Sequence, residues 1–344
     1  MSNNKRCIAL YSGGLDSILA IKMLQEQSIE VIAVYFCTPF FGLHALSDPE
    51  SFCALQKEKY GITVHPTDFT FEIIKIISSP KHGYGKHLNP CVDCKIGMLK
   101  KAKEMMDVFD ASFVITGEVV GQRPMSQRKD AMNGILKEAG LKDKLIRPLC
   151  AKLMQPSLPE REGWVNRELL GDISGRGRKR QIALASKYGI QPHHIPSPAG
   201  GCLLTYEQVA NKVRSTFSRF RPEFPLPADL MLDIAGRKFV FNDKTVFIVS
   251  RSEEENRTLS IMKHPGNIFM KVADVPGPLC VLRGEATDEH LARGAGICLR
   301  YGKARGVSGN VAVYGPDPFA MTATIEAPVF TEEHCKLFHV DSSN

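Results

Sequence analysis

Six consecutive residues near the start of the chain have the side chains and the backbone freedom needed to hold an anion. They are Ser12, Gly13, Gly14, Leu15, Asp16 and Ser17. The two glycines let the backbone approach a ligand closely, and both serines add hydroxyl donors. The apolar run 7–11 before them and the amphipathic stretch 18–25 after them predict a strand, a tight loop and a helix. Since the first amides of such a helix carry a positive partial charge, the loop is predicted to bind phosphate.

Three cysteines could supply a second kind of chemistry. Cys91 and Cys94 stand three residues apart, directly before a helical pattern over 95–109, and Cys202 follows two glycines much later in the chain. Because the N-terminus of a helix lowers the pKa of a nearby thiol, we expect a thiolate at the Cys91–Cys94 pair. The spacing alone leaves open a chance pair, a redox dithiol and a zinc half-site completed by a histidine. The candidate histidines are His87, His193 and His194.

The elements that must position these residues alternate between strand and helix patterns. Predicted strands cover 31–36, 62–65 and 113–116, and predicted helices cover 49–60, 71–77 and 181–188. Such alternation predicts an α/β fold with a doubly wound parallel sheet. Ligands of these sheets bind beyond the carboxyl ends of the strands. We therefore expect the loop 12–17 and the segment after Thr116 to face one pocket.

Length and patterning predict two domains. At 344 residues the chain exceeds the usual size of one domain. We expect a first domain over 1–219, a proline-containing linker over 220–229 and a smaller α+β domain over 230–344. The α+β assignment depends on strand patterns at 238–241, 245–249, 268–272, 279–282 and 310–314, and on a helical pattern at 288–301.

Composition excludes several classes of protein. The chain is 43% apolar and 24% charged, which is typical of a globular protein, and no apolar run approaches the ~20 residues of a membrane span. The first residues lack the pattern of a signal peptide, so we expect a cytoplasmic protein without membrane contact. In that setting the ten cysteines favour metal binding or thiol chemistry over disulfides. Those in apolar surroundings are predicted core residues, namely Cys7, Cys37, Cys150 and Cys280.

The order Ser-Gly-Gly-Leu-Asp-Ser has no lysine after its glycines, unlike the Walker loop, and resembles the pyrophosphate loop (PP-loop) of the N-type ATP pyrophosphatases. These enzymes activate a substrate by adenylation. Taken together with Cys91, Cys94 and Cys202, the loop is similar to that of the tRNA thiolation enzymes in this superfamily, whose sheet is of the adenine nucleotide alpha hydrolase type. The resemblance implies ATP bound by residues 12–17, Mg²⁺ near Asp16, and tRNA as the partner.

The same resemblance implies two alternative roles for the cysteines. In one branch of these enzymes, three cysteines hold a [4Fe–4S] cluster and leave one iron open, and thiolates are the normal ligands of such clusters. In the other branch, two cysteines act as a persulfide carrier and a resolving thiol. We favour the cluster because three thiols are available. The sulfur donor would be sulfide, or a cysteine desulfurase or persulfide carrier.

Residues 114–122, followed by Ser126-Gln127, are similar to a segment of the tRNA 4-thiouridine synthetases, and residues 145–149 are similar to their next landmark. The similarity implies that Gly117, Gln122 and Gln127 border the nucleotide and the bound base. The alternative for Gly117 is a plain turn at the end of a strand.

Two regions are candidates for RNA binding in a chain whose net charge is +7. The densest basic cluster comprises Arg176, Arg178, Lys179 and Arg180. Such a cluster can neutralise several phosphates, and a solvated start of a helix is the alternative. Residues 252–256 and 270–278 resemble the RNA-binding domain of the NFACT ribosome-quality-control proteins. That resemblance implies an RNA-binding module over 230–330, with a dimerisation or packing domain as the alternative.

These observations lead to one main hypothesis and two alternatives. The main hypothesis is an ATP-dependent tRNA sulfurtransferase, in which a uridine carbonyl oxygen is adenylated and then replaced by sulfur. Cys91, Cys94, Cys202 and Asp16 would be its catalytic residues. The first alternative is an amide-forming synthetase that uses ammonia, and the second is an RNA-binding factor with a vestigial ATPase domain. No particular oligomeric state is indicated.

Overall fold

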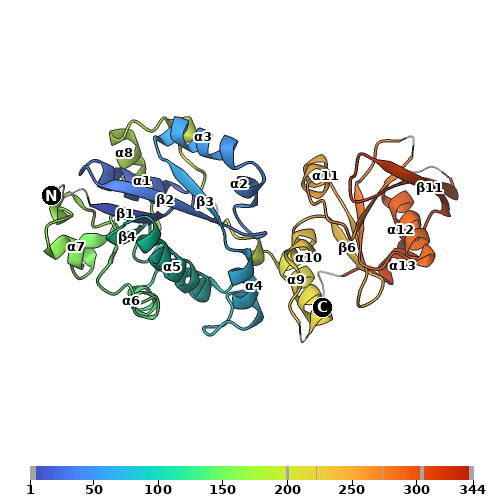
Figure 1. Cartoon of the computed structure of the whole chain (residues 1–344), viewed down its shortest axis with the longest axis horizontal. Helices are drawn as coiled ribbons and strands as arrows, with labels where there is room; N and C mark the ends of the chain where they lie inside the picture. The colour runs from blue at the N-terminus through green and yellow to red at the C-terminus, as the bar shows by residue number, and fades with distance from the viewer. Residues whose placement is uncertain (1–4, 199–200, 222, 274, 303–305, 341–344) are drawn as a thin grey trace. The chain divides into compact units, whose positions relative to one another are not determined.

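The chain is described from a computed structural model (Figure 1) over residues 5–198, 201–221, 223–273, 275–302 and 306–340. It divides into two compact units, Met1–Cys202 and Leu203–Asn344. Gly200, one of the two glycines before Cys202, and Asp274, in the NFACT-like segment, lie outside the described residues. Over the described part of the chain, no helix combines the length and the apolar character needed to cross a membrane.

The first unit contains a five-stranded sheet in the order β3-β2-β1-β4-β5. Every neighbouring pair is parallel, so the predicted α/β parallel sheet is confirmed. The strands are β1 (Arg6–Leu10), β2 (Glu30–Cys37), β3 (Val64–Asp68), β4 (Phe113–Thr116) and β5 (Leu145–Ile146). The strand order reverses between β1 and β4, and this is the point at which sheets of this kind bind ligands.

Helices cover both faces of this sheet (Figure 1), with α1 and α8 on one face and α4 and α5 on the other. The α-helices of the first unit are α1 (Leu15–Gln25), α2 (Leu43–Ser47), α3 (Pro49–Tyr60), α4 (Thr70–Ser78), α5 (Cys91–Val108), α6 (Lys129–Glu138), α7 (Leu158–Arg161) and α8 (Lys179–Lys187). Its 3₁₀ helices are η1 (Ala151–Leu153), η2 (Arg167–Leu169) and η3 (Pro192–His194). The helix predicted at 95–109 thus begins four residues earlier, directly after Pro90, which is its N-cap residue.

The cysteines predicted to be core residues are buried. Cys7, Cys37, Cys150 and Cys280 are all fully inaccessible to solvent. Burial raises the pKa of Cys37 to about 12 and that of Cys150 to about 11. These thiols are therefore protonated packing groups, and this prediction is confirmed.

The second unit contains a six-stranded sheet in the order β11-β10-β8-β9-β7-β6. All of its pairs are antiparallel, as the α+β assignment requires. The strands are β6 (Arg237–Val240), β7 (Val246–Val249), β8 (Asn267–Val272), β9 (Cys280–Arg283), β10 (Ser308–Tyr314) and β11 (Met321–Pro328). The edge strand β11 was not predicted, although its apolar residues alternate with polar ones as in a strand, namely Met321, Ala323, Ile325 and Ala327 with Thr322, Thr324 and Glu326 between them. Most of its side chains are exposed.

The α-helices of the second unit are α9 (Glu207–Phe220), α10 (Pro227–Met231), α11 (Glu253–Ser260), α12 (Asp288–Tyr301) and α13 (Glu332–Lys336), and its 3₁₀ helices are η4 (Leu203–Thr205) and η5 (Leu232–Ile234). Residues of α12 pack with Phe239, Phe247 and Met270 in one apolar cluster. Leu259 of α11 packs with Leu232 of η5 in a second cluster.

The division between the units lies before the predicted linker at 220–229. Helix α9 belongs to the second unit, where Lys212 Nζ donates hydrogen bonds to the carbonyls of Ala235 at 3.2 Å and Gly236 at 3.1 Å. Thr216 Oγ1 donates to Asp233 at 2.7 Å. These buried polar contacts join α9 to residues beyond the proline-containing stretch. That stretch is therefore part of the second unit and does not divide the two units.

A buried ion pair in the second unit gives a first prediction. Lys238 Nζ lies 2.7 Å from Asp233 Oδ1, and both side chains are almost fully buried. Removing one charge of such a pair leaves the other uncompensated, so Asp233→Asn is expected to reduce the free energy of unfolding by about 3–5 kcal/mol. Denaturant unfolding measures the loss, and hydrogen exchange of the β6 and β7 amides assigns it to this unit.

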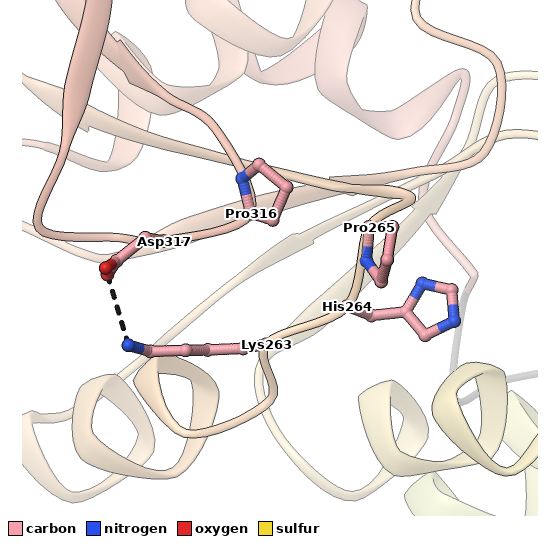
Figure 2. A pocket seen from close by; sticks show the side chains of 5 residues that line it. All are labelled: Lys263, His264, Pro265, Pro316 and Asp317. Atoms are coloured by element: carbon pink, nitrogen blue, oxygen red, sulfur yellow. Dashed lines mark ion pairs between the residues drawn. The ribbon is translucent and has the colours of Figure 1, made fainter.

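The matched control is an exposed pair in the same unit. Lys263 Nζ lies 3.2 Å from Asp317 (Figure 2), and both side chains are about half exposed. Asp317→Asn is expected to cost no more than about 1 kcal/mol. Equal effects of the two substitutions would contradict the role given to burial.

Candidate functional site

The loop 12–17 is closed by its own hydroxyl groups. Ser12 Oγ and Ser17 Oγ lie 3.2 Å apart, and Ser17 Oγ donates a hydrogen bond to the Gly14 carbonyl at 2.8 Å. Gly13 has a φ of +72° and open space beside its Cα. Helix α1 begins at Leu15 without a side-chain cap. Its first amides can therefore serve a bound anion.

The segment after β4 meets this loop directly. Strands β1 and β4 are neighbours, with Leu10 paired to Thr116. A Cβ atom on Gly117 would lie 2.5 Å from the Ser17 amide nitrogen and 2.6 Å from the Asp16 carbonyl carbon. Only glycine allows the two backbones to come so close. The structure thus gives Gly117 a packing reason that a plain turn would not require.

Gln122 extends the same contact. Its Nε2 donates a hydrogen bond to Asp16 Oδ2 at 2.8 Å, across 106 residues of sequence. Two of the predicted site residues are therefore brought together by the fold. Gln127 supports the same segment through its backbone, because its carbonyl accepts a hydrogen bond from the Gly121 amide at 2.7 Å.

A cavity of about 380 Å³ lies beside Ser12 and Gly13. Its walls include the rings of Tyr35 and Phe52, which stack with centroids 4.9 Å apart. Gln56 also lines it, and its Oε1 accepts a hydrogen bond from Tyr11 Oη at 2.6 Å. Aromatic walls with a few fixed polar groups are typical of sites for flat heterocycles.

Sequence reasoning missed this cavity. Tyr35 lies on a predicted strand and Phe52 and Gln56 on a predicted helix, where such residues normally belong to the core. Their common position beside Ser12 depends on how α3 packs against the sheet, so no local signal marks it. His193 and His194 also line this cavity.

Cys91 and Cys94 lie in the first turn of α5 rather than before it. Burial is the main cause that raises the pKa of Cys94 to about 12. The thiols of Cys202 and Cys91 and the carboxylate of Asp93 act in the same direction, and the charge of Lys95 opposes them. The expectation of a favoured thiolate is therefore wrong for Cys94, because burial and like charges outweigh the helix terminus.

The three thiols are nevertheless neighbours, since the ionisation of Cys94 is affected by both of the others. Within the described residues, no three His, Cys, Asp or Glu side chains are arranged to hold a single metal ion. The zinc alternative, with His87, His193 or His194 as a further ligand, therefore gains no support. The donor set of three thiols still fits the chemistry of an iron–sulfur cluster.

Glu118 is a buried site residue that the sequence did not single out. It is only 2% exposed, lies 3.2 Å from Arg147 and accepts a hydrogen bond from Thr116 Oγ1 at 2.8 Å. Burial acts to raise the pKa of Glu118, but Lys95 and Arg147 hold it below its ordinary value. This network fixes the segment after β4, and the charge of Lys95 lowers the pKa of both Glu118 and Cys94.

Comparison with known proteins identifies two segments of the chain. Residues 2–152 match the family model described as thiamine biosynthesis protein (ThiI), and residues 236–338 match the model described as NFACT protein RNA binding domain. Both resemblances are confirmed. We refer to these stretches as the ThiI segment and the NFACT segment.

The relatives match only part of this chain. A probable tRNA sulfurtransferase of Thermococcus kodakarensis is 31% identical over 123 residues, which cover 34% of this chain. The chain spans about 30% of the length of the curated relatives it matches.

Two solved structures are also similar. A 4-thiouridine synthetase in complex with RNA and bound ATP is 16% identical with a TM-score of 0.34, over 56% of this chain and 53% of its own. The U34-tRNA thiolase NcsA from Methanococcus maripaludis, with its [4Fe–4S] cluster, is 19% identical with a TM-score of 0.32, over 58% of this chain and 61% of its own.

The basic cluster lies outside both named segments, as does Cys202. Arg178 donates a hydrogen bond to the Pro196 carbonyl at 2.8 Å, and Arg180 pairs with Asp172. Arg176 and Lys179 are exposed. The Gly175 amide donates to the Val120 carbonyl at 2.8 Å, so the cluster adjoins the part of the ThiI segment that carries Gln122.

Proposed function

We propose that this chain is an ATP-dependent tRNA sulfurtransferase. One observation carries the proposal, namely that the segment 119–127 contacts the PP-loop and also contacts a neighbour of Cys91. Gln122 of this segment bonds to Asp16 in the PP-loop, and Met125 lies 3.9 Å from Asn89, whose amide bonds to Cys91. The names of the relatives of the ThiI segment support the same reaction class.

The PP-loop would bind the phosphates of ATP. No side chain caps the start of α1, and the space beside Gly13 is open, so the first amides of the helix can face a phosphate. The neighbouring cavity has room and aromatic walls for the adenine ring. Asp16 would hold Mg²⁺, which prefers carboxylate oxygens. The loop amides would stabilise the negative charge that develops on the phosphates during reaction.

The reaction then needs two displacements. A uridine carbonyl oxygen attacks the α-phosphorus, the bond to the bridging oxygen breaks, and pyrophosphate leaves. Sulfide then adds to the activated ring carbon, and AMP departs with the former carbonyl oxygen. Adenylation is needed because the carbonyl oxygen is otherwise a poor leaving group. The target base has to leave its stack to reach residues this close to the sheet.

Cys91, Cys94 and Cys202 would hold a [4Fe–4S] cluster. When bound, such a cluster supplies an open iron able to carry sulfide from the donor. The persulfide route, with two of the same cysteines as carrier and resolving thiol, is the other form of this proposal. Ten free cysteines and a tRNA substrate are typical of the cytoplasm.

The RNA partner would contact the basic cluster and the NFACT segment. Lys179 and Arg180 lie in the first turn of α8, where positive charge is unfavourable for the helix dipole. An RNA phosphate at that position would be bound by both the side chains and the helix terminus.

Reversing the exposed charges tests this contact. The double variant Arg176→Glu/Lys179→Glu is expected to weaken tRNA binding and to reduce the slope of log K against log salt by about two, because two phosphate contacts are lost. Lys100→Glu/Lys103→Glu is the matched control on the exposed side of α5. Filter binding over a salt series measures both. Equal losses in the two variants would point to net charge rather than to this cluster.

The contact between Gln122 and Asp16 is equally testable. Gln122→Glu would place a second carboxylate within 3 Å of Asp16, and the repulsion is expected to raise KM for ATP at least ~10-fold. Gln25→Glu, at the far end of α1, is the control. The rate of pyrophosphate release at varied ATP measures the change. An unaltered KM would remove Gln122 from the nucleotide site.

The whole proposal is tested by the nucleosides of tRNA from a strain that lacks this chain. Mass spectrometry should show the loss of one thiouridine and its return when the full chain is supplied. Unchanged thiouridine would overturn the proposal. Pyrophosphate release that depends on ammonia rather than on tRNA would instead identify an amide-forming synthetase.

A further inference from the structure

The side-chain amide of Asn89 lies between two sulfur atoms. Its Nδ2 is 3.2 Å from Cys91 Sγ and 3.9 Å from Met125 Sδ. Asn89 is only 7% exposed. Each of its two N–H groups therefore has a sulfur acceptor, and the bond to Cys91 has ordinary hydrogen-bond length for sulfur.

The orientation of this amide is fixed by an unambiguous donor. The backbone N–H of His87 donates to Asn89 Oδ1 at 3.3 Å. A backbone N–H cannot accept a hydrogen bond, so the oxygen must face His87 and the nitrogen must face the sulfur atoms. The Asn89 carbonyl accepts from the Gly85 amide at 2.9 Å and from the Cys91 amide at 3.0 Å, which fixes the backbone as well.

Gly85 clears the space that this amide occupies. A Cβ atom on Gly85 would lie 2.8 Å from Met125 Sδ and even closer to Asn89 Nδ2. Gly85 is not among the residues with positive φ, so its backbone conformation does not require glycine. Glycine is required here because any larger side chain would collide with the Asn89 amide.

From this geometry we infer that Asn89 is a positioning residue for the sulfur chemistry. Its N–H donates to the Cys91 sulfur, holds that sulfur at the site and withdraws negative charge from it when it serves as a ligand. Hydrogen bonds to ligand sulfur stabilise the reduced state of a cluster and raise its reduction potential. The inference rests on the proposed function, because it assigns Asn89 to the same three-cysteine site.

The test uses the full chain after anaerobic reconstitution with iron and sulfide. Asn89→Asp keeps the size of the side chain but replaces the N–H donor by a carboxylate oxygen. We expect iron to be lost to a chelator about 10-fold faster than from the unaltered chain, together with a lower midpoint potential. Gly85→Ala should shift both in the same direction, because its methyl group displaces an unaltered amide.

Asn166→Asp is the matched control. Among the described residues, the side chain of Asn166 accepts one hydrogen bond through Oδ1, from the Glu168 amide at 3.0 Å, and aspartate retains that acceptor. Its iron loss and its potential should equal those of the unaltered chain. The potential separates the proposed role from general loosening, since it is measured on chains that have loaded the cluster.

Two negative results can be told apart. If the unaltered chain loads iron and both variants keep its rate of iron loss and its potential, the inference is overturned and the proposed function stands. If the unaltered chain loads no iron, the cluster form of the proposed function fails. The comparison is then made on persulfide carried by Cys91 after treatment with cysteine and a cysteine desulfurase. The inference predicts at least ~10-fold less in both variants, and equal amounts would overturn it.

Discussion

Cys202→Ala is expected to lower tRNA thiolation by the full chain at least ~100-fold, because it removes one of the three thiols of the proposed cysteine site. Within the described part of the chain, the thiols that raise the pKa of Cys94 are those of Cys202 and Cys91. Adenylation depends on the PP-loop instead, so release of pyrophosphate in the presence of tRNA should continue. Single-turnover assays that follow thiouridine and pyrophosphate in the same sample measure the separation of the two steps.

Cys53→Ala is the control for this substitution. Cys53 is a partly buried cysteine of the same unit, and its Sγ contacts the Val64 carbonyl at 3.2 Å. It should retain both steps. Full thiolation by the Cys202 variant would contradict the three-cysteine site. Equal loss of both steps would show that Cys202 supports the fold rather than the transfer of sulfur.

Gly117→Ala is expected to abolish ATP binding and to destabilise the first unit by about 2 kcal/mol. The added methyl group would lie 2.5–2.7 Å from backbone atoms of Asp16 and Ser17. Backbone atoms at the start of α1 cannot move away as the end of a flexible side chain can. The PP-loop must therefore shift, and its amides would no longer be oriented to donate hydrogen bonds to the phosphates. Calorimetric titration with ATP and a thermal unfolding scan measure the two effects.

Gly134→Ala provides the matched control. Gly134 lies inside α6, and a Cβ atom there would meet nothing within 4 Å. Alanine at this position should stabilise the helix by up to about 1 kcal/mol and leave ATP binding unchanged. Normal ATP affinity in the Gly117 variant would show that the close approach of the two backbones is not needed by the loop.

Elements with local signals at both ends could be predicted from the sequence. Helix α3 was predicted with its observed bounds, Pro49–Tyr60, and the structure shows why. Asp48 caps its first turn by accepting from the Ser51 amide, and Gly61 ends it with a φ of +62°. Strand β4 was predicted with its observed bounds as well, because it is a buried run of four residues. In such cases the neighbouring residues alone decide the structure.

Elements defined by distant partners could not be predicted. The buried side of helix α9 carries Lys212 and Thr216, so the sequence alone suggests a polar, exposed face. Their hydrogen-bond partners are Asp233 and the carbonyls of 235–236, which lie on a later segment. The same limit applies at the site. The PP-loop could be recognised from its six residues, whereas the aromatic cavity and the amide of Asn89 depend on contacts between segments that the sequence keeps apart.

The contacts of segment 119–127 have a thermodynamic consequence. The segment contacts two parts of the site, because Gln122 contacts Asp16 and Met125 contacts Asn89. A ligand that binds at Asp16 and moves this segment would change the affinity of the cysteine site for its own ligand. Thermodynamic linkage requires the second ligand to change the affinity for the first by the same factor. Under the proposed function, the ratio of ATP affinities with and without sulfur at the cysteines would therefore equal the ratio of sulfur affinities with and without ATP. Measuring the effect of sulfur on ATP binding and measuring the effect of ATP on sulfur binding would thus give the same coupling free energy.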